Sequence, residues 1–272
     1  MKNLFVSMAC LLMATCVWAQ QKTVSVSSAG TLANEISAAE RSSVTSLKVS
    51  GPLNGNDVKL LREMGKASLA ELDLSDAKIV KGGESYYPLG EQKSAYTEDD
   101  RLSTLFFYGC GSLRSVTIPS SVKSVSNDAF SSCPNLAEIK VKNSPFFVSV
   151  DGILFNAEKE RLIRCPQAKK LESYEVPRGV VEIYPSAFRG NTSLKSITLP
   201  RSIWSISDMS FYGCTSLQTI RCKMTRVASL AEAFDASTMN TAKVYVPKEA
   251  LEDYKSVNIW NRFKNFIGVE GE

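Results

Sequence analysis

A pattern that recurs about every 23 residues constrains the fold of this 272-residue chain more than any other feature. Each unit begins with F-x-x-C or F-x-x-N, and a leucine follows the small residue three positions later. That leucine opens an L-x-x-Φ-x-Φ segment, where Φ is apolar, and its alternating end predicts a strand with one buried face. The phenylalanines are Phe107, Phe130, Phe188, Phe211 and Phe234, and the first four carry the full motif.

The longer gap between Phe130 and Phe188 contains an insertion and does not break the repeat. Residues 171–176 keep the phase of the following unit and predict a strand that ends before Pro177. Residues near 143–168 are therefore inserted. Within them, Asp151-Gly152 lies between two apolar alternations, a pattern that predicts a β-hairpin because glycine tolerates positive φ.

One such unit is too short to bury its own leucines, whereas stacked units bury one another's in a continuous core. The pattern therefore predicts a solenoid that is mainly β with short helices. A column of small residues fits its interior, and we expect the cysteines in it to be structural rather than redox-active or metal-binding. The column consists of Cys110, Cys133, Asn191 and Cys214.

The segments that flank repeats 102–243 predict caps, which keep terminal rungs from exposing an open sheet edge. The N-terminal cap spans 20–101, and we expect a helix at 57–64 with Asn56 as its N-cap. The C-terminal cap spans 244–272, with a last strand at 244–247 and a helix at 248–254. Three aromatic residues are expected to cover the final rung: Trp260, Phe263 and Phe266.

The A-F-x-x-C/N-x-x-L-x-x-Φ-x-Φ-P units at Ala129 and Ala187 resemble the BspA-like leucine-rich repeat family. The insertion at 150–155 and the ending at 245–260 are similar to the same family. The resemblance covers roughly 45–272 and implies a leucine-rich repeat solenoid of about 23-residue repeats with one β-hairpin insertion. It also implies export by Gram-negative bacteria of mouth and gut, in a family whose founding members are surface adhesins. This chain is shorter and has no evident immunoglobulin-like or anchoring domain, so the resemblance supports the fold more than a direct adhesin role.

Residues 1–19 have the features of a signal peptide: a basic start, an apolar stretch and a small-residue cleavage site before Gln20. A lipoprotein signal that uses Cys16 is the alternative, although Thr15 is a poor residue before a lipidated cysteine. No later segment is apolar for long enough to span a membrane. We expect an exported protein at the cell surface or secreted, with the periplasm as the alternative.

The composition argues against several classes of function. The chain has no histidine, so Ser-His and Cys-His dyads and imidazole metal ligands are excluded. A net charge of +4 is too small and dispersed for a nucleic-acid partner. The acidic triplet 98–100 lacks the alternating spacing of a calcium loop. We therefore expect no catalysis, cofactor or metal, and an unrecognised enzyme is a remote alternative.

Two regions are candidates for binding a protein partner. One is the outer sheet face, where polar residues recur at the repeat spacing. The other is the polar loop 82–101, where contact and disorder are competing interpretations. An ordinary solvated face, and an envelope scaffold without a host partner, are the alternatives to protein–protein binding. The candidate residues are Thr117, Lys140, Glu175, Thr198 and Arg221 on the sheet, and Tyr86, Tyr87 and Tyr96 in the loop.

Overall fold

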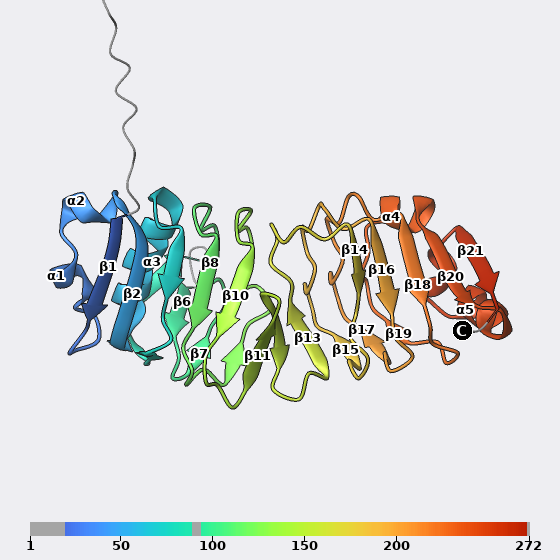
Figure 1. The fold of residues 1–272 in the computed structure, drawn as a ribbon, viewed down its shortest axis with the longest axis horizontal. Coiled ribbons are helices and arrows are strands. Elements are labelled where there is room, and N and C mark those ends of the chain that lie inside the picture. The colour runs from blue at the N-terminus through green and yellow to red at the C-terminus, as the bar shows by residue number, and fades with distance from the viewer. Residues whose placement is uncertain (1–19, 89–93, 271–272) are drawn as a thin grey trace, which may run out of the picture.

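The computed structural model describes residues 20–88 and 94–270, and the predicted signal peptide with Cys16 lies outside these residues. Figure 1 shows the strands side by side in an elongated row from β1 at one end to β21 at the other. Five short α-helices accompany them in the described residues, which confirms the prediction of a mainly β chain with short helices. Within the same ranges, no helix has the length and apolar character needed to cross a membrane.

The N-terminal half is built on a parallel sheet in the order β1-β2-β3-β8-β10, with β4 paired to the far part of β2. In β8 and β10, Ser115 pairs with Glu138, its counterpart in the next unit, so the repeat spacing becomes the strand register. The strands are β1 (Gln20–Ser25), β2 (Val44–Leu53), β3 (Glu71–Asp73), β4 (Ala77–Ile79), β8 (Ser115–Ile118) and β10 (Glu138–Val141).

The C-terminal half has its own parallel sheet in the order β14-β16-β18-β20-β21. Ser173 pairs with Ser196 and Ser196 with Thr219, so each residue again lies opposite its counterpart in the next unit. The prediction that 244–247 is the last strand is wrong, because β21 pairs along the whole of β20. The strands are β14 (Ser173–Glu175), β16 (Ser196–Leu199), β18 (Thr219–Cys222), β20 (Lys243–Pro247) and β21 (Asn265–Val269).

A third sheet, in the order β11-β12-β13-β15-β17-β19, begins in the insertion. Its first two strands pair antiparallel across Asp151 and Gly152, whose φ angles are 50° and 76°. Positive φ at both positions is the geometry that a two-residue hairpin turn requires. The strands are β11 (Phe147–Val150), β12 (Ile153–Asn156), β13 (Arg161–Arg164), β15 (Glu182–Ile183), β17 (Ser205–Ile206) and β19 (Ser229–Leu230).

Two small sheets lie beside these three: β5 with β6, and β7 with β9. The first is formed by the segment predicted as a polar loop, whose residues 89–93 lie outside the described part. The remaining elements are β5 (Gly82–Pro88), β6 (Ser94–Thr97), β7 (Arg101–Leu102), β9 (Ser124–Val125), α1 (Leu32–Glu35), α2 (Ala38–Arg41), α3 (Gly55–Ala67), α4 (Ala236–Thr241), α5 (Leu251–Ser256), η1 (Lys248–Ala250) and η2 (Trp260–Arg262).

The helix α3 begins at Gly55, earlier than predicted, and its N-cap is Asn54 rather than Asn56. Asp57 determines this start. Its carboxylate is 1% exposed and accepts backbone N–H groups from Gly30, Leu32 and Asn54 at 2.5, 2.9 and 2.9 Å. One buried carboxylate therefore ties the helix start to the α1 segment.

Phenylalanine rings form two stacks inside the molecule. The Phe107 and Phe130 rings are 5.4 Å apart, and the Phe188, Phe211 and Phe234 rings follow one another at 5.0 and 4.8 Å. Trp260 closes the C-terminal end: its side chain is fully buried and its indole N–H donates to the Ala228 carbonyl at 2.9 Å. Within each stack, the repeated phenylalanine thus packs one unit onto the next.

All cysteines among the described residues are buried and unpaired. Cys133 and Cys214 donate their thiols to the Phe107 and Phe188 carbonyls at 3.0 and 3.1 Å, in both cases across to the preceding unit. Burial raises the pKa of Cys110 to about 12 and that of Cys133 to about 11, from a usual 9.0. This environment protects the thiol form and opposes nucleophilic chemistry.

This burial predicts both thiol reactivity and pH-dependent stability. In a chain that begins at Gln20, no thiol should react with a chromogenic disulfide reagent until denaturant unfolds the protein. The unfolded thiols ionise from about pH 9 and the folded ones only near pH 11–12, so the unfolded state loses protons first and the free energy of unfolding should fall across that window. Urea titrations at pH 8 and pH 10 measure this fall. Rapid reaction of a thiol at neutral pH without denaturant would contradict the prediction.

Candidate binding surface

The polar residues predicted as one column lie on two separate sheets. Thr117 and Lys140 are adjacent in the N-terminal sheet, whereas Glu175, Thr198 and Arg221 are adjacent in the C-terminal sheet. In the described residues no pairing joins β10 to β14, because the chain between them enters the third sheet. The predicted face is therefore divided at the insertion.

Thr117 is not available for contact, and its prediction as an exposed residue is wrong. Its side chain is 5% exposed because β8 lies between β3 and β10. Lys142, just beyond β10, reaches Asp73 on β3 with an Nζ–Oδ2 distance of 2.8 Å. This ion pair links β3 to the end of β10, the two strands that lie on either side of β8.

Lys140 is exposed, and its ammonium group lies 2.9 Å from a carboxylate oxygen of Glu138 on the same strand. The hydrogen bond from Lys140 lowers the pKa of Glu138 below its usual value. Ion pairs this exposed contribute little to stability. The N-terminal face therefore presents internally paired charges and has no aromatic residue among its register partners Lys48, Asp73 and Thr117.

The C-terminal face is different because it carries an arginine–tyrosine pair. Thr198, Arg221 and Tyr245 are register partners on neighbouring strands. The Arg221 guanidinium lies over the Tyr245 ring, 4.3 Å from its centroid. Such a cation–π contact holds both side chains extended on the sheet face. Glu175 completes the row and pairs with Lys223 at 3.2 Å.

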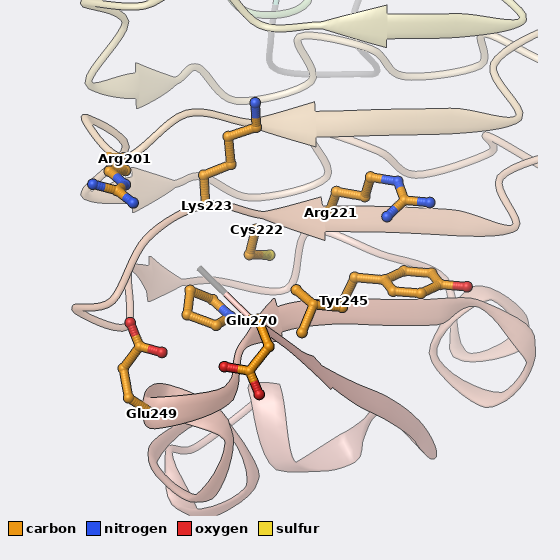
Figure 2. A pocket seen from close by; sticks show the side chains of 9 residues that line it. Arg201, Arg221, Cys222, Lys223, Tyr245, Glu249 and Glu270 are labelled. Atoms are coloured by element: carbon orange, nitrogen blue, oxygen red, sulfur yellow. The ribbon is translucent and has the colours of Figure 1, made fainter. Parts of the chain in front are cut away.

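A cavity of about 200 Å³ lies beside this pair, at the ends of β18 and β20. Figure 2 shows Arg221 and Tyr245 extended together to one side of Cys222, with Glu249 and Glu270 on the other side. Pro247 and Val269 add apolar surface. A shallow cavity with apolar and charged walls suits a partner's side chain better than a reaction that must exclude water.

The three tyrosines of 82–101 occupy different environments. Tyr86 is 5% exposed: its hydroxyl donates to the Thr104 carbonyl at 2.7 Å, and burial raises its pKa. Its prediction as a surface contact is therefore wrong, since the ring packs on Phe106 at 5.7 Å. Tyr87 is half-buried against the Arg62 guanidinium at 4.6 Å, and only Tyr96, at 55%, is widely exposed.

The side chains also define which chemistry this surface supports. In the ranges 20–88 and 94–270, no three Cys, Asp or Glu side chains are grouped closely enough to hold a metal ion. The face carboxylates Glu138 and Glu175 belong to different sheets, so they do not form an acid–base pair.

The repeat units match a known family. Six copies of the family described as BspA type leucine rich repeat region align with residues 100–159 and 164–258, more than half of the chain. The chain belongs to this BspA-type leucine-rich repeat family. Among curated proteins, none matches the chain.

Three solved structures of leucine-rich or surface proteins resemble this BspA-type chain. A leucine-rich repeat protein from Eubacterium ventriosum is 14% identical, covering 85% of this chain and 74% of that chain, with a TM-score of 0.46. A leucine rich cell surface protein from Faecalibacterium prausnitzii is 19% identical with the same coverage and TM-score. The pneumococcal vaccine antigen PcpA is 15% identical, covering 86% of this chain and 82% of that chain, with a TM-score of 0.41.

The structure adds surface residues that the repeat pattern did not identify as contacts. Tyr245 is the aromatic member of the C-terminal row, and Arg201 and Lys223 line the cavity beside it. Both cations lie just after a strand of a BspA-type repeat unit. Lys223 directly follows β18, and Arg201 follows Pro200, the first residue after β16. The position after the strand is the sequence signal that finds them.

Proposed function

We propose that this chain is an exported protein-binding module that presents the outer face of its C-terminal sheet to a partner. The observation that carries the proposal is the Arg221–Tyr245 pair beside its cavity. Arginine and tyrosine are enriched among residues that dominate protein interfaces, and a partly apolar pocket lets a partner side chain be desolvated there. Glu175 and Thr198 extend the same face.

The repeat architecture supports the same proposal. Stacked units held by strand pairing at the repeat spacing are typical of a solenoid, and solenoids commonly bind partners along an extended face. Membership of a family typical of interacting surface proteins supports it further. Lys140 and Tyr96 are secondary contacts in this proposal, because both are exposed but neither lies in the Arg221–Tyr245 row.

We expect an Arg221→Ala/Tyr245→Ala double substitution to weaken partner binding at least about thirtyfold, which corresponds to the loss of about 2 kcal/mol. The wild-type chain is immobilised and offered surface extracts of source cells and of neighbouring bacterial or host cells. Any retained protein is then titrated against both chains. The matched control is Arg226→Ala/Trp204→Ala, which removes one exposed arginine and one exposed aromatic ring that the proposal does not place at the contact.

Equal retention by the wild type and by the double variant would contradict the proposed face. A partner derived only from the source cell's own envelope would favour the alternative of an envelope scaffold. The absence of any retained protein from all extracts would contradict the binding function itself.

The location is tested separately. Residues 1–19 support export, and we infer a cell-surface or secreted protein, with the periplasm as the alternative. Protease added to intact source cells should degrade the chain, or the chain should be abundant in the medium. Protection until the cells are lysed would place it in the periplasm and contradict a surface role.

A further inference from the structure

A second cavity, of about 470 Å³, lies on the turns that carry the F-x-x-C/N motifs and not on the sheet face. Its walls come from turns of successive units, on both sides of the insertion. Two arginines, two tyrosines and one carboxylate give it its chemistry: Arg164, Arg189, Tyr108, Tyr212 and Asp128.

Beside this cavity, the insertion places a cysteine where the repeat has a phenylalanine. The backbone N–H of Phe188 donates to the Ser210 carbonyl at 2.7 Å, and that of Cys165 donates to the Ala187 carbonyl in the same way at 2.7 Å. Cys165 thus occupies the place of a phenylalanine, and Arg164 the place of the preceding alanine. Because Cys165 has no ring, the phenylalanine stacks stop on either side of it, at Phe130 and Phe188.

Arg164, at the alanine position next to Cys165, is a buried cation. Its side chain is 3% exposed, and its guanidinium donates to the Ser186 and Phe130 carbonyls at 2.5 and 3.3 Å. Its Nε has no hydrogen-bond partner, and no carboxylate among the described residues acts on its charge at close range. A buried charge without a counter-charge is unfavourable, so an anion in the cavity would stabilise it.

The other buried arginine shows how this chain satisfies such a group when its role is structural. Arg62 donates to three carbonyls, those of Tyr86, Leu105 and Tyr108, and its guanidinium lies over the Tyr87 ring at 4.6 Å. Arg164 has two carbonyl partners and no ring. Compared with Arg62, the Arg164 guanidinium therefore has fewer hydrogen-bond partners and no cation–π partner.

Arg189 adds a second cation at the exposed side of the cavity. Its guanidinium lies over the Tyr212 ring at 5.5 Å, and Tyr212 is 46% exposed. Asp128 is the carboxylate that lines the cavity, and its Oδ1 accepts the Leu105 N–H at 3.3 Å. Two cations and one anion leave the walls with a single net positive charge.

We propose that this cavity binds a small monoanionic carboxylate that also carries hydroxyl groups, which is the chemistry of an acidic sugar. A guanidinium pairs with a carboxylate through two parallel hydrogen bonds. Asp128 repels a second negative charge and accepts a hydrogen bond from a hydroxyl group. Tyr108 and Tyr212 supply flat apolar walls, and a volume of about 470 Å³ lies within the range of small-ligand sites. This site is independent of the sheet face.

The test is calorimetric titration of the purified chain with glucuronate, and with glucose, sulfate and phosphate as comparison probes. Glucuronate should bind, glucose and the two inorganic anions should bind at least tenfold more weakly, and added salt should weaken glucuronate binding. Equal binding of glucose, stronger binding of sulfate or phosphate, or no binding of glucuronate would each overturn the proposal.

Variants assign the binding to this cavity. Arg189 is exposed, so Arg189→Gln should keep the wild-type melting temperature and weaken glucuronate binding about tenfold. The matched control is Arg178→Gln, an exposed arginine after Pro177 that does not line this cavity. Asp128→Asn keeps an acceptor for Leu105 but removes the charge, so it should strengthen phosphate binding. Equal effects of the two arginine variants, or unchanged phosphate binding in Asp128→Asn, would contradict the site.

Discussion

Replacing Phe211 by alanine is expected to lower the free energy of unfolding by about 3–5 kcal/mol, the usual cost of removing a fully buried phenylalanine. The Phe211 ring is stacked between Phe188 and Phe234, with centroids at 5.0 and 4.8 Å, and it is 0% exposed. Its loss therefore leaves a cavity that touches three successive units. Urea denaturation followed by circular dichroism measures the change.

The matched control for Phe211→Ala is its neighbour in sequence, Tyr212→Ala. Tyr212 is 46% exposed and contacts Arg189 only at the surface, so its removal should cost less than about 1 kcal/mol. If the two variants lost equal stability, the ring stack would not be what holds these units together.

Replacing Asp57 by alanine should lower the free energy of unfolding by at least about 3 kcal/mol, because three backbone N–H groups lose a charged acceptor. The groups belong to Gly30, Leu32 and Asn54, and the carboxylate is 1% exposed, so water does not readily replace it. We expect the N-terminal cap to loosen first, seen as faster hydrogen exchange in α1 and at the start of α3.

Glu63→Ala on the same helix is the control for Asp57→Ala. Glu63 is exposed and has no capping role, so the substitution should change stability by less than about 0.5 kcal/mol. Asp57→Asn keeps one acceptor oxygen and should fall between the two. A loss for Asp57→Ala no larger than that for Glu63→Ala would contradict the role of the buried carboxylate.

The repeat was readable from sequence because it depends on local periodicity. An apolar residue at every second position predicts the buried side of a strand, and the spacing between units is the same spacing that pairs Ser173 with Ser196. The strand predicted at 171–176 contains β14 for this reason. The strand β21 was missed because its apolar residues surround Gly268 and lie outside the repeat pattern.

The candidate surface was only partly readable from sequence. Alternation placed Lys140, Thr198 and Arg221 on the outer side of their strands, but exposure also depends on what lies across neighbouring strands. Thr117 is buried on β8, whose two neighbouring strands are linked by an ion pair between Asp73 and Lys142, 69 residues apart. The local periodicity of a sequence does not predict contacts between residues that are so far apart.

Local residue patterns were enough to derive the repeat unit: its spacing, its strand, its buried phenylalanine and the phase that resumes after the insertion. Those features follow from backbone periodicity and from the need of each unit to bury its apolar side against the next. Three other features became visible only in the folded chain. The insertion divides the polar face, Tyr86 packs inward, and Cys165 takes the place of a phenylalanine with Arg164 buried beside it. These features depend on contacts between side chains that are far apart in the sequence, and such contacts are set by the packing of the whole chain.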